Sequence, residues 1–165
     1  IYVPLPTTLH EEMVTKCVEH NKHVLCEKPC AVTSEDLLKM LKKCYANSII
    51  FVDGVMFMHN TRLYEVRKKI DKELALGKTK VREVSSAFCF RGDESFFKSN
   101  IRVNKSGDPL GCLGDLGWYN IRFSLFAYNF EMPEFVKGEI VSENTDGVPL
   151  HFQGSKNVPQ PVYLE

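Results

Sequence analysis

The chain has 165 residues, of which 44% are hydrophobic and 25% are charged, as is typical of a globular domain with a buried core. Its 21 Lys and Arg residues balance 21 Asp and Glu residues, so the formal net charge is zero. This balance argues against a nucleic-acid-binding surface and a polybasic membrane patch, and no apolar run reaches transmembrane length.

The six cysteines indicate reduced thiols, in the cytoplasm or another reducing compartment. They include no Cys-x-x-Cys pair, and no convergent ligands occur at metal-site spacings, so no metal is expected. The chain opens without Met on strand-like Ile1-Tyr2-Val3 and ends on Tyr163-Leu164-Glu165. We therefore expect an internal fragment, whose lack of a signal peptide says nothing of the location of the intact protein.

Three short apolar segments read as strands. They cover residues 1–3, which are halted by prolines, residues 23–25, and a buried run at 49–52. Helix-like segments separate them, and this alternation predicts βαβ units and hence a parallel sheet.

The two intervening helices carry terminal signals. Thr8 and Glu11 fit a capping box, and Asn21 is a residue that tolerates the left-handed conformation at a helix end. Thr33 or Ser34 is expected to cap the second helix. The side chains expected to be buried are Met13, Val14, Cys17, Val18, Leu37, Leu38, Leu41 and Cys44.

Beyond residue 52 the pattern changes. Apolar residues at helical spacing from Leu63 to Leu74 predict a helix that stops near Gly77, and 84–90 alternate like a half-exposed antiparallel strand. Residues 91–113 read as a long polar loop of the kind that often carries function. A helix after Tyr119 and a strand at 135–142 complete the predicted elements.

Two motifs carry the chemistry. Leu25-Cys26-Glu27-Lys28-Pro29 places a lysine at the carboxyl end of a strand, where open α/β sheets bind ligands. Gly114-Asp115-Leu116-Gly117-Trp118-Tyr119 brings an aspartate and a tyrosine to a turn that can open a helix. Lysine, aspartate and tyrosine form a plausible proton-transfer group for a carbinol or carbonyl. Phenols ionise well above neutral pH, so Tyr119 needs a nearby cation such as Lys28.

Each residue also has a structural interpretation. Lys28 could be an exposed lysine at a strand end, Tyr119 a core aromatic, and Asp115 a helix cap that also orients Lys28. His10 could be solvent-exposed at the start of its helix. Pro29 fits a constrained turn with a cis peptide bond before it.

These motifs resemble the glucose–fructose oxidoreductase / inositol dehydrogenase / MocA (Gfo/Idh/MocA) family. The likeness rests on Val3-Pro4-Leu5-Pro6-Thr7-Thr8-Leu9-His10, on the Glu-Lys-Pro motif, and on an Asp-x-Gly-x-His-like signature with Tyr119 in place of His. The tyrosine is similar to the dimeric dihydrodiol dehydrogenase branch, and segments around Phe90 and Asp115 look like uncharacterised plant and algal members.

The resemblance implies an α/β fold with two domains. Residues 1–52 would be the C-terminal part of a dinucleotide-binding Rossmann domain, and 53–165 part of an α+β domain with an open, largely antiparallel sheet. The implied cofactor is NAD or NADP, with NADP slightly preferred, although the Gly-x-Gly-x-x-Gly turn is absent here. The implied substrate is a small carbohydrate or diol.

The resemblance also implies roles for individual residues. Lys28, Asp115 and Tyr119 would be catalytic. Pro4, Pro6, Thr7, His10, Glu27, Lys28 and Pro29 would bind the cofactor, and His59, Arg91 and Trp118 would border the substrate. A homodimer through the C-terminal sheet is expected, because Phe88 and Phe90 would share one apolar sheet face.

Two other function classes remain open. The missing phosphate-binding turn would suit a non-catalytic scaffold that reuses the fold, and a sugar-binding module without turnover is a third possibility. The presence of Lys28, Asp115 and Tyr119 together favours the enzyme.

Overall fold

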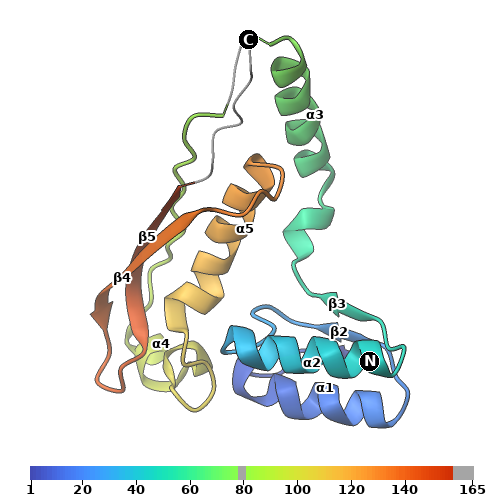
Figure 1. Cartoon of the computed structure of the whole chain (residues 1–165). Coiled ribbons are helices and arrows are strands. Elements are labelled where there is room, and N and C mark those ends of the chain that lie inside the picture. Colours follow the sequence, from blue (N-terminus) through green and yellow to red (C-terminus); the bar gives the residue numbers. More distant parts are fainter. Residues whose placement is uncertain (78–80, 158–165) are drawn as a thin grey trace.

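The computed structural model describes residues 1–77 and 81–157 (Figure 1). Near the N-terminus, β1 (Tyr2–Val3), β2 (Val24–Cys26) and β3 (Phe51–Asp53) form a parallel sheet in the order β1-β2-β3. The predicted βαβ units are therefore confirmed, with the second and third strands ending one residue later than expected.

Helices α1 (His10–Glu19) and α2 (Ser34–Ala46) pack side by side against one face of this sheet (Figure 1). The buried cluster between helices and sheet comprises Val3, Val14, Cys17, Val18, Val24, Cys26, Cys30, Met40, Cys44 and Ile49. Leu38 and Leu41, expected inside, are exposed by 51% and 40%. The buried stripe of α2 follows Leu37, Met40 and Cys44, one row round the helix from the two exposed leucines.

The helix-end predictions had mixed outcomes. Thr33 caps α2, since its Oγ1 accepts a hydrogen bond from Asp36 N (3.1 Å), and Asn21 has the expected positive φ of 54°. The capping box at Thr8 and Glu11 is wrong. A 3-10 turn, η1 (Thr7–Leu9), leads directly into α1, and Thr8 Oγ1 instead donates to Ser106 O (2.8 Å).

The second face of the parallel sheet is open in the described residues. Tyr2, Leu25 and Val52 lie opposite one another in the register and are all exposed. The third strand is therefore only partly buried, contrary to expectation, because helices cover a single face here.

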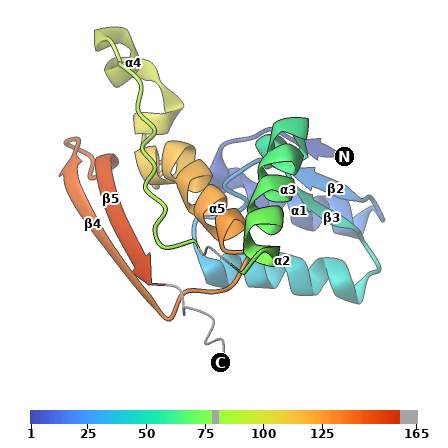
Figure 2. The ribbon, with the colours of Figure 1, turned by 90° about the horizontal axis from the view of Figure 1, so that it is seen from above.

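The second region surrounds a central helix. In both views α5 lies between α3 and a β-hairpin (Figures 1 and 2). The buried side chains of this region, among the described residues, are Val55, Leu63, Val103, Asp108, Phe126, Ala127 and Val148. The elements are η2 (Met56–His59), α3 (Thr61–Ala75), α4 (Glu94–Ser99), η3 (Ile101–Val103), the π-helix η4 (Leu113–Gly117), α5 (Trp118–Ala127), β4 (Phe135–Glu143) and β5 (Pro149–Asn157).

The predicted α3, α5 and β4 are confirmed, but the strand at 84–90 is wrong. Residues 81–93 have no regular structure, and the described strands pair only as β1-β2-β3 and β4-β5. Phe88 packs instead against Tyr119, and Phe90 against Phe96. The segment 91–113 is not one loop, since it contains α4 and η3.

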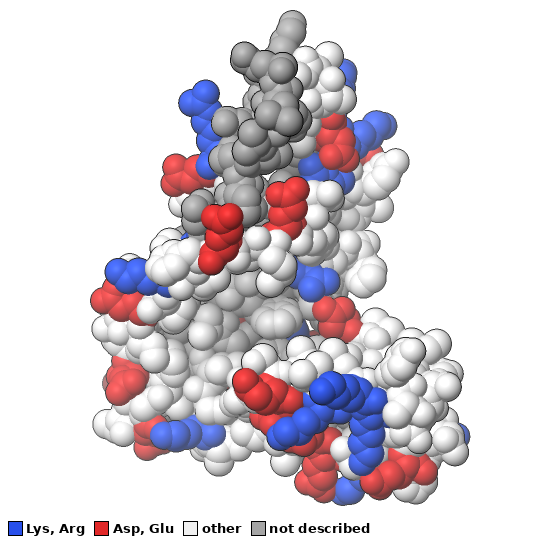
Figure 3. Space-filling view, viewed as in Figure 1, with Lys and Arg blue, Asp and Glu red and all other residues white. Residues whose placement is uncertain are grey.

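Within the described residues, no helix is long and apolar enough to cross a membrane. Positive and negative side chains are interspersed over the described part of the face drawn in Figure 3. The elements agree with the predicted α/β fold, with a small antiparallel sheet after the parallel one. The division at residues 52 and 53 stays a prediction.

Candidate active site

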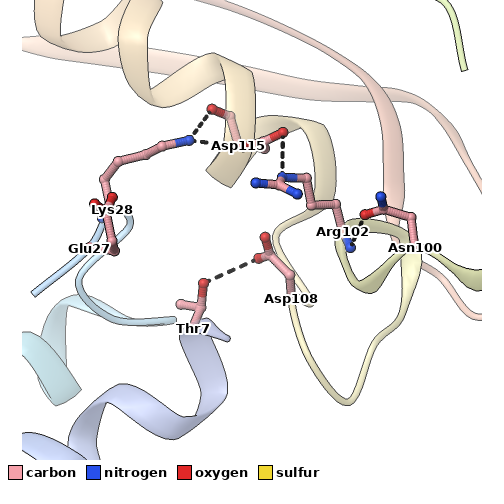
Figure 4. A network of polar contacts seen from close by, with 7 residues as sticks. All are labelled: Thr7, Glu27, Lys28, Asn100, Arg102, Asp108 and Asp115. Atoms are coloured by element: carbon pink, nitrogen blue, oxygen red, sulfur yellow. Dashed lines mark hydrogen bonds and ion pairs between the residues drawn. The ribbon is translucent and has the colours of Figure 1, made fainter. Parts of the chain in front are cut away.

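Lys28 and Asp115 meet although they are 87 positions apart in the chain (Figure 4). Lys28 is the second residue after β2, and its peptide bond to Pro29 is cis, as expected. Lys28 Nζ donates to Asp115 Oδ1 (2.8 Å) and to the Asp115 main-chain oxygen (2.7 Å). Their side chains are only 10% and 15% exposed, so the ion pair is largely removed from solvent. The carboxyl end of the parallel sheet is thereby joined to η4.

Asp115 lies between two cations. Its Oδ2 is 2.9 Å from Arg102 Nε, on the side of the carboxylate away from Lys28 (Figure 4). Burial alone would raise the pKa of Asp115, but the hydrogen bonds and charges of Lys28 and Arg102 outweigh it, so the pKa lies below the ordinary aspartate value. Asp115 is therefore an ionised carboxylate that orients Lys28, and it makes no side-chain cap to α5.

Tyr119 follows Asp115 by one helical turn, in the first turn of α5. Lys28 Nζ lies 4.6 Å from the centroid of its ring. Two aromatic rings flank it, with centroid distances of 5.5 Å to Phe57 and 5.7 Å to Phe88. The three predicted catalytic residues are thus brought together, with a cation on the tyrosine ring and apolar walls beside it.

The loops after β1 and β2 are tied together by His10. Its Nδ1 lies 3.1 Å from Pro29 O and its Nε2 lies 2.8 Å from Leu5 O, and the ring is buried. The solvent-exposed alternative for His10 is therefore wrong. Its ring braces the backbone of both predicted cofactor loops, and its contribution to cofactor binding stays a prediction.

The other predicted cofactor residues lie on the same two loops. Thr7 is buried, Pro6 is partly buried and Pro4 is exposed. Glu27 Oε1 accepts a hydrogen bond from the Tyr2 hydroxyl (2.7 Å), and this bond to a carboxylate raises the pKa of Tyr2. Glu27 Oε2 also accepts from Lys28 N (3.3 Å), which holds the turn that presents Lys28.

The predicted substrate residues are more scattered. His59 lines a cavity of about 370 Å³ beside Arg67 and Phe126, and none of Lys28, Asp115 and Tyr119 lines it. Arg91 is exposed on the irregular segment before α4. Trp118 adjoins Tyr119, and its Nε1 is buried without a hydrogen-bond partner in the described residues. Their substrate roles stay predictions.

Two charged residues at the site escaped the sequence motifs. Arg102 and Asp108 both come from the segment at 91–113, whose length and polarity were the only available signals. Asp108 is buried, and its Oδ1 lies 3.5 Å from Thr7 Oγ1 (Figure 4). Burial, and then the neighbouring Asp115 charge, raise the pKa of Asp108.

The thiols near the site are shielded. Cys26 and Cys30 are buried, and their hydrogen bonding and burial raise the pKa of Cys26, which disfavours the reactive thiolate. In the part of the chain that the structure describes, no group of three His, Cys, Asp or Glu side chains could hold a metal ion.

Residues 1–54 match the model of the oxidoreductase family with an NAD-binding Rossmann fold (GFO_IDH_MocA). The chain is 26% identical over 164 residues to scyllo-inositol 2-dehydrogenase (NADP(+)) IolU of Bacillus subtilis, covering 96% of this chain and 48% of that protein. It is 27% identical over 145 residues to dTDP-3,4-didehydro-2,6-dideoxy-alpha-D-glucose 3-reductase of Streptomyces violaceoruber, covering 88% and 40%. The chain therefore spans less than half the length of these relatives.

A solved structure shares the fold. The aldose-aldose oxidoreductase from Caulobacter crescentus, complexed with glycerol, aligns with a TM-score of 0.73 at 22% identity, over 96% of this chain and 46% of that one. This likeness confirms the α/β fold. Residues 1–54 are thus similar to the NAD-binding Rossmann fold of the Gfo/Idh/MocA oxidoreductases, and most of the chain is similar to parts of the two named relatives.

Proposed function

We propose that the intact protein is an NAD(P)-dependent oxidoreductase that interconverts a carbinol and a carbonyl on a sugar, polyol or diol. The observation that carries this proposal is the convergence of Lys28, Asp115 and Tyr119 at the carboxyl end of the parallel sheet. The matched relatives are named as a dehydrogenase and a reductase of sugar-like compounds, which supports an enzyme over a scaffold.

Each of the three residues would have a separate role in the reaction. Tyr119 would exchange a proton with the substrate oxygen, as general base in oxidation and general acid in reduction. Lys28, with its ammonium 4.6 Å from the Tyr119 ring centroid, favours an anionic oxygen on the phenol or the substrate. Asp115 holds Lys28 in place through the 2.8 Å bond to Oδ1. The neighbouring Phe57 and Phe88 rings would help to orient the ring of Tyr119.

The two loops joined by His10 fit a nicotinamide and its ribose. They meet at the carboxyl ends of parallel strands, where open α/β sheets bind ligands. When bound, the nicotinamide supplies or accepts the hydride. NADP is the preferred form of the cofactor in this proposal. The residues that would hold it are Pro4, Pro6, Thr7, His10, Glu27, Lys28 and Pro29.

Finer features of the proposal rest on the sequence motifs. Tyr119 in the histidine position supports a dihydrodiol dehydrogenase-like branch close to plant and algal proteins. We further propose that residues 1–52 complete a Rossmann domain in a longer protein and that 53–165 form part of its second domain. A homodimer through the β4–β5 hairpin is also proposed, because β4 exposes Phe135, Val136, Ile140 and Val141.

Substitution of the proton-transfer group tests the function. In the intact protein, Lys28→Ala and Tyr119→Phe should each lower kcat by about 10² or more, the scale expected for loss of a general acid–base group. Turnover of inositols and aldoses is measured by the absorbance of the reduced nicotinamide cofactor at about 340 nm. The matched controls are Lys22→Ala and Tyr45→Phe, at exposed positions. Wild-type rates for Lys28→Ala and Tyr119→Phe would exclude the proposed mechanism.

A further inference from the structure

Arg102 is the charged neighbour of the Lys28–Asp115 pair that neither motif contains. Its Nε lies 2.9 Å from Asp115 Oδ2, while Lys28 Nζ lies 2.8 Å from Oδ1 (Figure 4). One largely buried carboxylate is thus shared by two cations from separate segments of the chain. Each oxygen of Asp115 has its own positive partner, which fixes the rotation of the carboxylate as well as its position.

The backbone that carries Arg102 is held from two directions. Asn100 Oδ1 accepts a hydrogen bond from Arg102 N (3.0 Å), and Asn144 Nδ2 donates to Val103 O (2.7 Å). Val103 is buried, whereas the Arg102 side chain is 49% exposed. Since burial does not fix this side chain, its bond to Asp115 is what orients the guanidinium.

Arg102 also changes the charge balance near Tyr119. Lys28 and Asp115 alone form a neutral pair, in which the carboxylate offsets the field of the ammonium at the phenol. Arg102 adds one positive charge to this group. The other charged or titratable groups around it are Glu27, beside Lys28, and Asp108, whose carboxyl lies near both Arg102 and Asp115. Whichever form Asp108 takes, the charge contributed by Arg102 is the same.

We propose that Arg102 is a positioning residue for proton transfer by Tyr119. By holding Asp115 Oδ2 it keeps Oδ1 on Lys28, and its charge offsets the carboxylate so that Lys28 acts on the phenol with its full field. This inference rests on the proposed function, because it presumes that Tyr119 exchanges the substrate proton.

The test compares Arg102→Met and Arg102→Lys in the intact protein, with Lys98→Met as the matched control. Lys98 is an exposed cation on neighbouring α4, and among the described residues its ion-pair partner is the exposed Glu94. For Arg102→Met we expect kcat to fall roughly tenfold to hundredfold, the scale of one charge-assisted hydrogen bond. The KM for the nicotinamide cofactor should stay within about twofold, because Arg102 acts on the proton and not on cofactor binding.

The pH profile separates a charge effect from a packing effect. In the direction of carbinol oxidation, kcat is expected to rise with pH as the proton acceptor ionises, and we call this part of the plot of kcat against pH the rising limb. For Arg102→Met the rising limb should move to higher pH by about one unit, as expected for loss of one charge at the edge of a buried site. Arg102→Lys keeps the charge and loses the planar fork, so its limb should stay at the wild-type pH while kcat falls several-fold. Lys98→Met should match wild type in both.

The outcomes are distinguishable from failure of the function itself. If Lys28→Ala lowers kcat but Arg102→Met has wild-type kcat and limb, the inference is wrong and the proposed function stands. If Arg102→Met does not fold, Arg102→Gln replaces it, and equal losses in Arg102→Gln and Arg102→Lys with no shift of the limb would reduce Arg102 to a packing role. If Lys28→Ala and Tyr119→Phe both turn over normally, the proposed function and this inference fail together.

Discussion

The parallel-sheet region and the helix–hairpin region differ in how they bury their side chains. In the first, α1 and α2 close a continuous apolar cluster against the sheet. In the second, Phe126 and Ala127 are buried on α5, while every residue of β4 is exposed. The first region therefore has one continuous apolar core, whereas the buried apolar side chains of the second region are spread over separate elements. Because an open strand with apolar side chains favours association, the proposed homodimer contact is placed in the second region.

The candidate site lies where these unequal regions meet. Lys28 comes from the well-packed sheet, while Asp115 and Arg102 come from the region with the smaller core. Thr8 Oγ1 and Ser106 O, and Thr7 and Asp108, add polar contacts along the same boundary. A lysine on the better-packed region thus meets a carboxylate on the region with the smaller core. We therefore expect perturbation of the second region to affect activity before it affects the sheet.

The exposed apolar strand of the second region predicts that the intact protein has twice the mass of one chain. Light scattering of the intact protein at about micromolar concentration should give the mass of a dimer, since the exposed apolar side chains of β4 need cover. The double variant Val136→Lys and Ile140→Lys should be monomeric. Tyr45→Lys, at an exposed site on α2, should remain dimeric. A wild-type monomer would remove the assigned role of the hairpin.

The next effect concerns the closed core. Met40 is 2% exposed at the centre of the first region, so Met40→Ala should cost about 2–5 kcal/mol of unfolding free energy through lost burial and a residual cavity. Leu38→Ala, two residues away on the exposed row, should cost no more than about 0.5 kcal/mol. Denaturant unfolding followed by circular dichroism measures both. Similar losses for the two variants would contradict the packing described for α2.

The smallest effect uses two carboxyls of the second region. The folded-state pKa of Asp115 is lowered, so its contribution to stability is present above the ordinary value of 3.8 and is lost as the pH falls through the folded value. The pKa of Asp108 is raised, so its ionised form costs stability at neutral pH, and this cost disappears as the pH falls toward 3.8. Asp115→Asn should therefore lower stability at pH 7 by about 1–3 kcal/mol, whereas Asp108→Asn should not.

Unfolding curves at several pH values check this pair. At neutral pH the free energy of unfolding of Asp115→Asn should be lower than that of wild type, and this deficit should shrink in acid. Any gain in the free energy of unfolding of Asp108→Asn over wild type should shrink in acid as well. Two variants that destabilise equally at neutral pH would show that Asp108 is a satisfied carboxylate like Asp115.

The first region was predictable because its signals are local. Thr33 and Asn21 mark helix ends by chemistry that acts within a few residues, and the strands are short apolar runs. The errors arose where a neighbour decides the outcome. The alternation of apolar and polar residues at 84–90 suits a strand, but the Phe88 ring packs against the Tyr119 ring and not on a sheet face. Met40 is buried and Leu38 is exposed, because packing against α1 and the sheet decides which face of α2 is buried.

The candidate site divides in the same way. Lys28, Asp115 and Tyr119 could be found because each lies in a short motif with a recognisable backbone setting. Arg102 and Asp108 could not be found in this way, because their partners, Asp115 and Thr7, lie outside any shared motif. Only the folded chain brings these residues together. Polarity and length marked their segment, but not which of its charges would point inward.

Lys28 has a second acceptor at position 115 that belongs to the main chain. The Asp115 carbonyl oxygen, in the widened turn of η4, accepts from Nζ at 2.7 Å, beside the carboxylate bond. A substitution at 115 can delete the carboxylate, but every amino acid supplies that carbonyl. Lys28 would therefore keep one anchor whatever side chain stands at 115, which gives a lineage a route to alter the charge of the site without freeing its lysine.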